Sequence, residues 1–363
     1  MNKAFSIYLD LVRFLAAFVV VLYHSRDVLW IPWSIARYGN EAVIVFFVLS
    51  GYVISFVADE KEKTLKAFAI SRATRIYSVA IPALVLTWFL DTVGFHLLNS
   101  AAYPPGKRAW SLPLVRAFAG LTFTGEIWDT SIQMFSNLPY WSLHYEVWYY
   151  AAFAVLTYIG GRKRTMLFVL LCAFVGPKLL LLMPVWWAGV LLYRWQRLRN
   201  ISMNAGYLMV ALSTMALFLY NPMGPQAAPT VAFYPLGFSD RFLTDYLFAL
   251  IVVAHFLGVR AICLRHGSLL LAAERPIRSL AATTFALYLL HQPLLLFFNA
   301  AYFAQPFTMT RYVLVMLSTI LSAFALNNAI EANKKPLRWV IARLADGVHT
   351  SSYRLLRPFA KTT

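Results

Sequence analysis

The amino-acid sequence predicts an all-α membrane protein with about ten transmembrane helices. Hydrophobic residues make up 60% of the 363 residues and charged residues only 13%, whereas a soluble domain has about 25% charged residues. The apolar residues come in runs of about 17–23, the length that crosses roughly 30 Å of hydrocarbon. Most of the 32 Lys and Arg residues fall in alternate connections between these runs. Because Lys and Arg favour cytoplasmic loops, both termini are expected in the cytoplasm.

The net charge of +17 reflects this topology and does not indicate nucleic-acid binding. The first apolar run is followed by Arg26 and Asp27 and not by a small-residue cleavage site, so it is expected to remain as a membrane helix. Cys172 and Cys263 lie in or beside apolar runs without the spacing of a metal site. They are expected to be packing residues.

The apolar runs predict the individual helices in order. The first five lie at about 7–25, 41–58, 75–95, 139–159 and 165–182, and the last five at about 184–198, 204–221, 242–259, 280–300 and 311–331. The fifth and sixth helices are separated only by Pro184 and its neighbours.

The connections carry three further expectations. The outer connection at 96–138 contains Pro, Gly and aromatic residues and is predicted to be re-entrant or interfacial, and a second outer loop at 221–240 is rich in Pro and Gly. Residues 337–344 mix basic and apolar side chains, which is typical of a helix lying on the inner leaflet. The transmembrane domain is therefore placed at 1–340, with a basic cytoplasmic tail at 341–363.

Ionisable side chains in the first predicted helix are the strongest sign of function. Asp10, Arg13 and His24 all lie in an otherwise apolar span. On an α-helix, Arg13 and His24 would be within roughly 20° of each other and about 16 Å apart along the axis. Because an ionisable group inside a bilayer costs a few kcal/mol, it usually lines a cavity or pathway. The alternative is that these side chains extend to the two membrane interfaces.

Two groups of polar residues follow in the second and third spans. Glu41 is expected at the outer end of the second span, level with His24, and Ser50 lies further along that span. Arg72 and Arg75 are three residues apart at the inner end of the third span, and would form a cationic face on one side of a helix. Such a face suits the phosphates of a nucleotide-like cofactor. Anchoring at the cytoplasmic interface is the alternative.

Later spans contain further polar side chains. Glu146 lies inside the fourth span and needs a partner, for which Arg13 and His24 are the candidates. Asp245 and His255 lie in the eighth span, and His255 is expected to be an interhelical hydrogen-bonding residue. The remaining histidines outside the ninth span are expected at the surface or in loops: His96, His144, His266 and His349.

Five short motifs in one order resemble the acyltransferase-3 family of bacterial membrane acyltransferases. They contain, in turn, Arg13 and His24; Phe46, Phe47, Ser50, Gly51 and Tyr52; Arg72, Arg75, Ile76 and Tyr77; Trp141, Ser142, Leu143 and Glu146; and Tyr288, His291 and Pro293. The resemblance covers about residues 5–340. It implies a ten-helix domain of the bacterial inner membrane that moves an acyl group, usually acetyl, from acyl-coenzyme A to a hydroxyl of a surface polysaccharide or other glycosylated compound.

The resemblance also implies that Arg13 and His24 are essential and that Glu146, Arg72 and Arg75 belong to the same site. From the chemistry of acyl transfer, His24 would act as base or as acyl carrier, Glu146 would orient it, and Arg13 would stabilise negative charge or pair with Glu146. Arg72, Arg75 and Tyr77 would bind acetyl-CoA, with no metal involved. The supporting or substrate-binding residues would be Asp10, Glu41, Ser50, Trp141, Ser142, Tyr149, Tyr288 and His291.

A transporter or flippase is the competing interpretation. In it, Arg13, His24, Glu146 and Asp245 form a proton relay and no chemistry takes place. An acyltransferase consumes acetyl-CoA and releases free thiol when its acceptor is present, whereas a carrier does not. The expected partners are membrane lipid and a carbohydrate acceptor, and the sequence identifies neither the acceptor sugar nor an oligomeric state.

Overall fold

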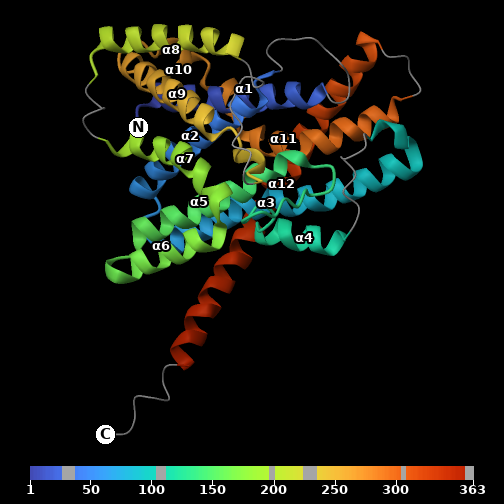
Figure 1. The fold of residues 1–363 in the computed structure, drawn as a ribbon, viewed down its shortest axis with the longest axis horizontal. Helices are drawn as coiled ribbons and strands as arrows, with labels where there is room; N and C mark the ends of the chain where they lie inside the picture. Colours follow the sequence, from blue (N-terminus) through green and yellow to red (C-terminus); the bar gives the residue numbers. More distant parts are fainter. Residues whose placement is uncertain (27–36, 104–111, 196–200, 224–234, 304–307, 356–363) are drawn as a thin grey trace.

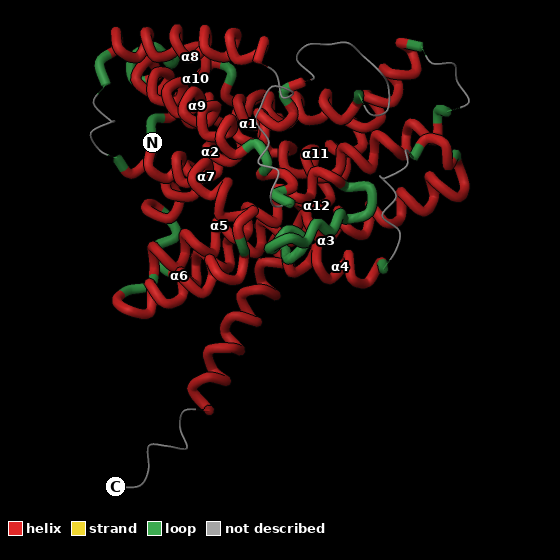
Figure 2. Tube along the Cα trace, in the orientation of Figure 1, coloured by secondary structure: helices red, strands yellow, loops and turns green. Residues whose placement is uncertain are grey.

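The structure is a computed structural model, and it describes residues 1–26, 37–103, 112–195, 201–223, 235–303 and 308–355. Within these residues the chain is helices joined by short loops, with no strand (Figure 2). The all-α fold predicted from the sequence is confirmed.

Ten long helices correspond one to one with the ten predicted spans (Figure 1). They are α1 (Lys3–Ser25), α2 (Gly39–Glu60), α3 (Leu65–Val93), α5 (Trp141–Tyr158), α6 (Gly161–Val175), α7 (Pro177–Arg194), α8 (Met203–Met223), α9 (Phe242–Cys263), α11 (Glu274–Ala301) and α12 (Met309–Leu355). The shorter elements are η2 (Gly94–Leu98), η3 (Ser100–Ala102), α4 (Pro113–Thr122), η4 (Leu138–Tyr140), η7 (Gly237–Ser239) and α10 (Ser268–Ala272).

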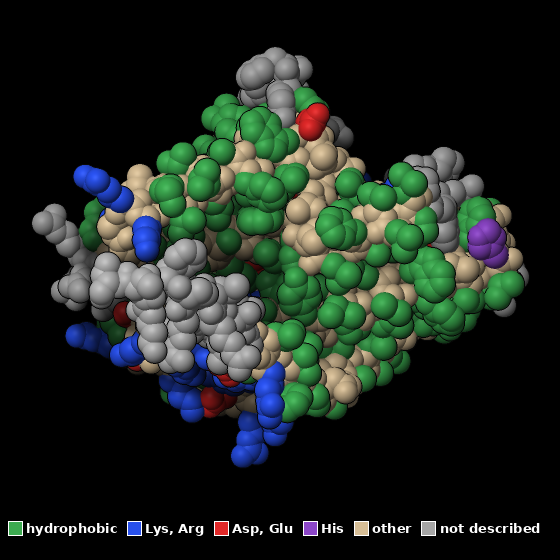
Figure 3. All heavy atoms as spheres, turned by 90° about the horizontal axis from the view of Figure 1, so that it is seen from below, with side chains coloured by type: hydrophobic (Ala, Val, Ile, Leu, Met, Phe, Trp, Pro, Cys, Tyr) green, Lys and Arg blue, Asp and Glu red, His purple; other side chains and the backbone are tan. Residues whose placement is uncertain are grey.

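Seven of the described helices are long and apolar enough to cross a membrane, namely α1, α2, α3, α8, α9, α11 and α12. The other three predicted spans are helices of 18, 15 and 18 residues, α5, α6 and α7. The chain is therefore a multi-pass membrane protein. Hydrophobic side chains cover most of the face in Figure 3, and Lys and Arg gather toward its left end.

The break between α6 and α7 does not lie at Pro184, as the sequence analysis expected. It lies at Gly176, whose φ of 79° falls in the left-handed region that favours glycine. Pro177 then occupies the first turn of α7, where a missing N–H costs no helical hydrogen bond. Pro184 stands inside α7, so the proline taken as a helix boundary is tolerated within the helix.

Two glycines let α2 and α7 approach closely. A Cβ atom on Gly51 would lie 2.0 Å from the carbonyl oxygen of Trp186, and one on Gly189 would lie 1.9 Å from the carbonyl oxygen of Val48. Small residues at such contacts let helix backbones pack tightly in membranes. The contact brings the Trp186 ring to Ser50, whose Oγ accepts a hydrogen bond from Trp186 Nε1 at 3.1 Å.

Between α3 and α5 the chain folds back against the bundle. The C-terminal end of α4 packs on the middle of α3, where a Cβ atom on Gly120 would meet Leu84 and the Tyr77 hydroxyl donates to the Leu121 carbonyl at 2.9 Å. The other face of α4 is exposed and apolar, with Leu114 84% and Phe118 67% exposed. The segment predicted to be re-entrant or interfacial, 96–138, thus includes a helix packed on α3, and its residues 104–111 lie outside the described residues.

The last helix is longer than predicted. Residues 337–344 are helical, but they continue α12 through Pro336 without forming a separate helix. The C-terminal part of α12 projects away from the bundle in Figure 1. Residue 340, the predicted end of the transmembrane domain, lies within this helix. Most of the predicted outer loop at 221–240 lies outside the described residues.

Candidate active site

A cavity of about 330 Å³ lies among six helices, α1, α2, α3, α5, α11 and α12. Its polar and charged lining residues are Asp10, Arg13, Ser50, Arg72, Arg75, Ser142, Glu146, Tyr150, Arg278, Thr284, Tyr288, Asn327, Glu331 and Lys334. Apolar residues such as Phe46, Leu143 and Phe285 fill the spaces between them. The volume is that of a small-molecule site, and the segments that build it are far apart in sequence.

Glu146 is held at the centre of this cavity by two hydroxyl groups. Ser50 Oγ donates a hydrogen bond to Glu146 Oε1 at 2.5 Å, and the Tyr150 hydroxyl donates to the same oxygen at 2.6 Å. The two donors come from α2 and from the next turn of α5. Short hydrogen bonds to a carboxylate are strong and directional, so the side chain of Glu146 is fixed in position.

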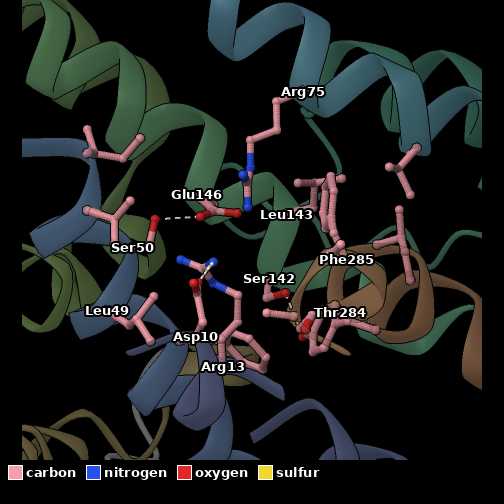
Figure 4. Close-up of a pocket in the computed structure, with 18 of the residues that line it drawn as sticks. Asp10, Arg13, Leu49, Ser50, Arg75, Ser142, Leu143, Glu146, Thr284 and Phe285 are labelled. Carbon is pink, nitrogen blue, oxygen red and sulfur yellow. Dashed lines mark hydrogen bonds and ion pairs between the residues drawn. The ribbon is translucent and has the colours of Figure 1, made fainter. Parts of the chain in front are cut away.

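Two guanidinium groups approach Glu146 from opposite sides. Figure 4 shows Arg13 from α1 and Arg75 from α3 pointing toward the carboxylate. Arg13 also forms an ion pair with Asp10 at 3.0 Å, and Asp10 is bound by Arg278 of α11 at 2.6 Å. Arg75 forms no ion pair among the described residues, and its guanidinium carbon lies 5.8 Å from the centroid of the Phe285 ring.

Basic residues dominate one end of the cavity. Its lining has five Lys or Arg residues, at positions 13, 72, 75, 278 and 334, against three acidic residues, at positions 10, 146 and 331. Arg72 is partly neutralised, since it forms an ion pair with Glu62 at 2.7 Å. The excess of positive charge favours an anionic ligand, because guanidinium groups bind phosphate and carboxylate oxygens in pairs.

The opposite end of the cavity is closed by Tyr288 and Ser142. Ser142 Oγ lies 2.7 Å from the Tyr288 hydroxyl, and the ring of Phe46 packs against the Tyr288 ring with centroids 5.3 Å apart. Tyr288 also contacts His291, with ring centroids 6.1 Å apart.

His24 lies beyond this closed end and does not line the cavity. Its ring packs against that of His291, with centroids 5.2 Å apart. Both rings are buried, with 7% of His24 and none of His291 exposed. The structure therefore brings Arg13 and Glu146 together in one cavity, whose lining includes Tyr288 but not His24. His24 is connected to this lining through His291, which packs against both His24 and Tyr288.

Pro293 leaves a carbonyl group of α11 available to bind the segment before α5. Pro293 has no N–H to donate to the carbonyl of Leu289, one turn earlier. The side-chain amide of Asn137 donates to that carbonyl at 2.7 Å instead. The segment before α5 is thus anchored to α11 one residue from Tyr288.

Several predicted site residues lie away from the cavity. Glu41 forms an ion pair with Arg241 at 3.3 Å, in a cluster where Asn40 binds Asp245 at 2.8 Å. This cluster is distinct from the cavity lining. The proton relay of the transporter interpretation is therefore not a continuous set of contacts among the described residues.

Three aromatic residues expected near the substrates also point elsewhere. The Tyr77 hydroxyl donates to Leu121, and the Tyr149 hydroxyl donates to the Leu179 carbonyl at 2.8 Å. Trp141 stacks on Phe238 with centroids 4.3 Å apart and lines a second, smaller cavity of about 90 Å³.

That smaller cavity contains His144, which is buried and not at the surface as expected. His144 Nδ1 accepts a hydrogen bond from the Gly125 N–H at 3.2 Å, and 1% of the residue is exposed. Beside it, Glu126 forms a buried ion pair with Lys178 at 2.9 Å. Burial raises the pKa of the Glu126 carboxyl above its usual value, and the nearby Lys178 opposes this shift.

One other prediction from a single residue is confirmed. His255 is an interhelical hydrogen-bonding residue, 3.0 Å from Ser213 Oγ and 2.8 Å from the Tyr8 hydroxyl. Of the two cysteines expected to be packing residues, Cys263 is buried and Cys172 is half-buried.

Sequence reasoning missed three residues that the cavity depends on. Tyr150 fixes Glu146, Arg278 bridges to Asp10, and Trp186 binds Ser50. The spacing of Tyr150, four residues after Glu146, places the two side chains on one helix face and could have identified it. The contacts of Arg278 and Trp186 are long-range and leave no local pattern.

The sequence is similar to known acyltransferases. A family model described as "Acyltransferase domain" matches residues 6–328. An O-acetyl transferase of Shigella phage Sf6 is 34% identical over 85 residues, which are 22% of this chain and 25% of that protein. The chain thus aligns with about a quarter of this curated relative. No solved structure gives a significant match.

Proposed function

Since this chain belongs to the acyltransferase-3 family, we propose that it transfers an acyl group, acetyl in the first instance, from acyl-CoA to a hydroxyl of a carbohydrate acceptor. The family makes it a membrane acyltransferase. The donor, the acceptor and the bacterial inner membrane as its site belong to the proposal. The observation that carries it is the cavity in which Glu146 lies between Arg13 and Arg75.

The cavity suits the reactive end of an acyl-CoA. Its volume of about 330 Å³ is at the lower end of the range for drug-sized ligands, so it would take the extended pantetheine arm and the thioester. The larger nucleotide part would stay at the basic end. Four basic residues of the lining would bind the phosphates, namely Arg72, Arg75, Arg278 and Lys334.

The proposed reaction breaks the thioester C–S bond and forms an ester C–O bond. His24 takes the proton of the acceptor hydroxyl as the oxygen attacks the thioester carbonyl. Arg13 stabilises the tetrahedral oxyanion. The coenzyme A sulfur leaves with the proton from His24, which restores the enzyme. His24 could instead carry the acyl group between donor and acceptor, which also releases the thiol.

The geometry adds one requirement to this scheme. Tyr288 lines the cavity and packs on His291, which packs on His24, so the Tyr288 side chain would move aside for the acyl group to reach His24. Donor and acceptor would then approach from opposite ends. The basic end of the cavity would face the cytoplasm, where acyl-CoA is made, and the acceptor would approach from the other face.

The test follows labelled acetyl-CoA in membranes that contain the protein. Wild type is expected to move label into the carbohydrate fraction and to release free thiol in equal amount. Arg75→Ala is expected to raise the KM for acetyl-CoA by about tenfold or more, the equivalent of 1.4 kcal/mol. Arg265→Ala, which removes an exposed arginine outside the cavity, is the control and should leave KM unchanged.

The variant His24→Ala separates chemistry from donor binding. It is expected to abolish transfer and to leave binding of coenzyme A unchanged, because His24 does not line the cavity. Full transfer activity in His24→Ala would remove His24 from the mechanism. Movement of a glycan across the membrane without thiol release would instead favour a transporter.

A further inference from the structure

The pairing of His24 with His291 gives the second histidine a definite chemical form. His291 Nδ1 lies 2.7 Å from the carbonyl oxygen of Tyr288 and 3.2 Å from that of Leu287. A carbonyl oxygen can only accept a hydrogen bond, so Nδ1 must carry the proton. In the neutral ring, Nε2 then has a lone pair and can only accept.

That lone pair is buried and unused. No part of His291 is exposed, and Nε2 has no hydrogen-bond partner among the described residues. Buried polar atoms are nearly always hydrogen-bonded, and each exception calls for an explanation. Two rings pack against it, those of His24 at 5.2 Å and Tyr288 at 6.1 Å between centroids, and the Tyr288 hydroxyl is already bound to Ser142.

We infer that His291 is the positioning residue for His24, and that its Nε2 accepts a hydrogen bond from an N–H of His24 during acyl transfer. This inference rests on the proposed function, in which His24 is the base or the acyl carrier. The bond holds His24 in one tautomer and directs its other ring nitrogen toward the acceptor hydroxyl. When His24 takes up the proton, both of its nitrogens carry hydrogen, and His291 accepts the bond from the one turned away from the substrate.

The sequence analysis gave this orienting role to Glu146. The structure instead binds Glu146 to Ser50 and Tyr150, between Arg13 and Arg75. Glu146 lines the cavity and His24 does not. His291 packs against His24, and as a neutral imidazole it would fix the direction of that ring without adding a charge to the buried site.

Two matched substitutions of His291 test this inference. In His291→Gln the side-chain oxygen reaches the position of Nε2 and can accept the bond from His24. In His291→Asn the shorter amide can replace the Nδ1–H donor to the Tyr288 carbonyl, but no acceptor reaches the position of Nε2. Both are polar residues of similar volume, so they are matched for folding.

The expected result is a fall in kcat for acetyl transfer of at least about 100-fold in His291→Asn, the usual contribution of a positioned acid or base. His291→Gln should keep kcat within about tenfold of wild type. The KM for acetyl-CoA should not change in either variant, because His291 does not line the donor cavity. Binding of coenzyme A to each purified variant confirms that it is folded.

Three results would overturn the inference. They are a wild-type kcat in His291→Asn, an equal loss of kcat in both folded variants, and a changed KM with kcat unaltered. A measurement on the unsubstituted protein gives an independent check. ¹⁵N NMR of labelled histidines should find the proton of His291 on Nδ1. A proton on Nε2 would contradict the inference. Failure of the proposed function looks different, because wild type itself would then release no thiol.

Discussion

Removal of one hydroxyl group next to Glu146 should slow acyl transfer sharply. The Tyr150 hydroxyl donates to Glu146 at 2.6 Å, and Tyr150→Phe deletes this bond while keeping the ring. A hydrogen bond to a charged group contributes about 1.5–3 kcal/mol. At about 1.36 kcal/mol for each factor of ten, the expected loss in kcat/KM is about 10- to 150-fold if Glu146 must be held in place for catalysis.

The neighbouring residue provides a matched control. Tyr149 lies on the same helix and is also buried, but its hydroxyl donates to the Leu179 carbonyl at 2.8 Å, away from the cavity. Tyr149→Phe should lower the free energy of unfolding by about 1 kcal/mol. It should leave the rate of transfer within about twofold of wild type, because its lost bond does not touch Glu146.

The assay is the initial rate of transfer from labelled acetyl-CoA, with thermal unfolding measured on the same preparations. Equal rates for Tyr150→Phe and wild type would refute the reasoning, since Glu146 would then need no fixed position. Equal losses in both variants would show that the effect comes from packing of α5 and not from the carboxylate.

Two further predictions concern stability. Gly51→Ala places a Cβ atom 2.0 Å from the Trp186 carbonyl, so it should destabilise the α2–α7 contact by about 1–3 kcal/mol. The melting temperature should fall. Gly160→Ala, whose Cβ meets nothing within 4 Å, should lower it much less, since it affects only the N-cap of α6. Lys178→Met should cost about 3–5 kcal/mol, because it leaves Glu126 buried and unpaired. Burial already raises the pKa of Glu126, so its carboxyl protonates readily in acid. The loss in free energy of unfolding caused by Lys178→Met should therefore be smaller at pH 5 than at pH 8. An equal loss at both pH values would contradict this account.

The helices could be predicted from the sequence because the membrane imposes a simple length rule. Each predicted span has its helix, and the errors lie at ends and joints. The helix break predicted at Pro184 was wrong because a proline inside a helix can be tolerated. The actual break depends on the positive φ of Gly176, which the sequence shows only as a glycine. The continuation of α12 through Pro336 was missed because this proline, too, is tolerated inside a helix.

The candidate site was predictable only in part. Arg13, Arg75 and Glu146 could be identified as buried charges in need of a common cavity, and the structure brings them together. The separation of His24 from that cavity could not be foreseen, because it depends on where the Tyr288 side chain lies between α11 and α5.

Photoaffinity labelling tests the central claim most directly, namely that the cavity among α1, α2, α3, α5, α11 and α12 binds the acyl donor. An acyl-CoA with a diazirine in its acyl chain is irradiated with the protein in membranes, and the labelled peptides are identified by mass spectrometry. Label on lining residues such as Phe46, Leu143 and Phe285, lost when free coenzyme A is added, is the predicted result. Label that is displaced by coenzyme A but lies outside the cavity would contradict the claim.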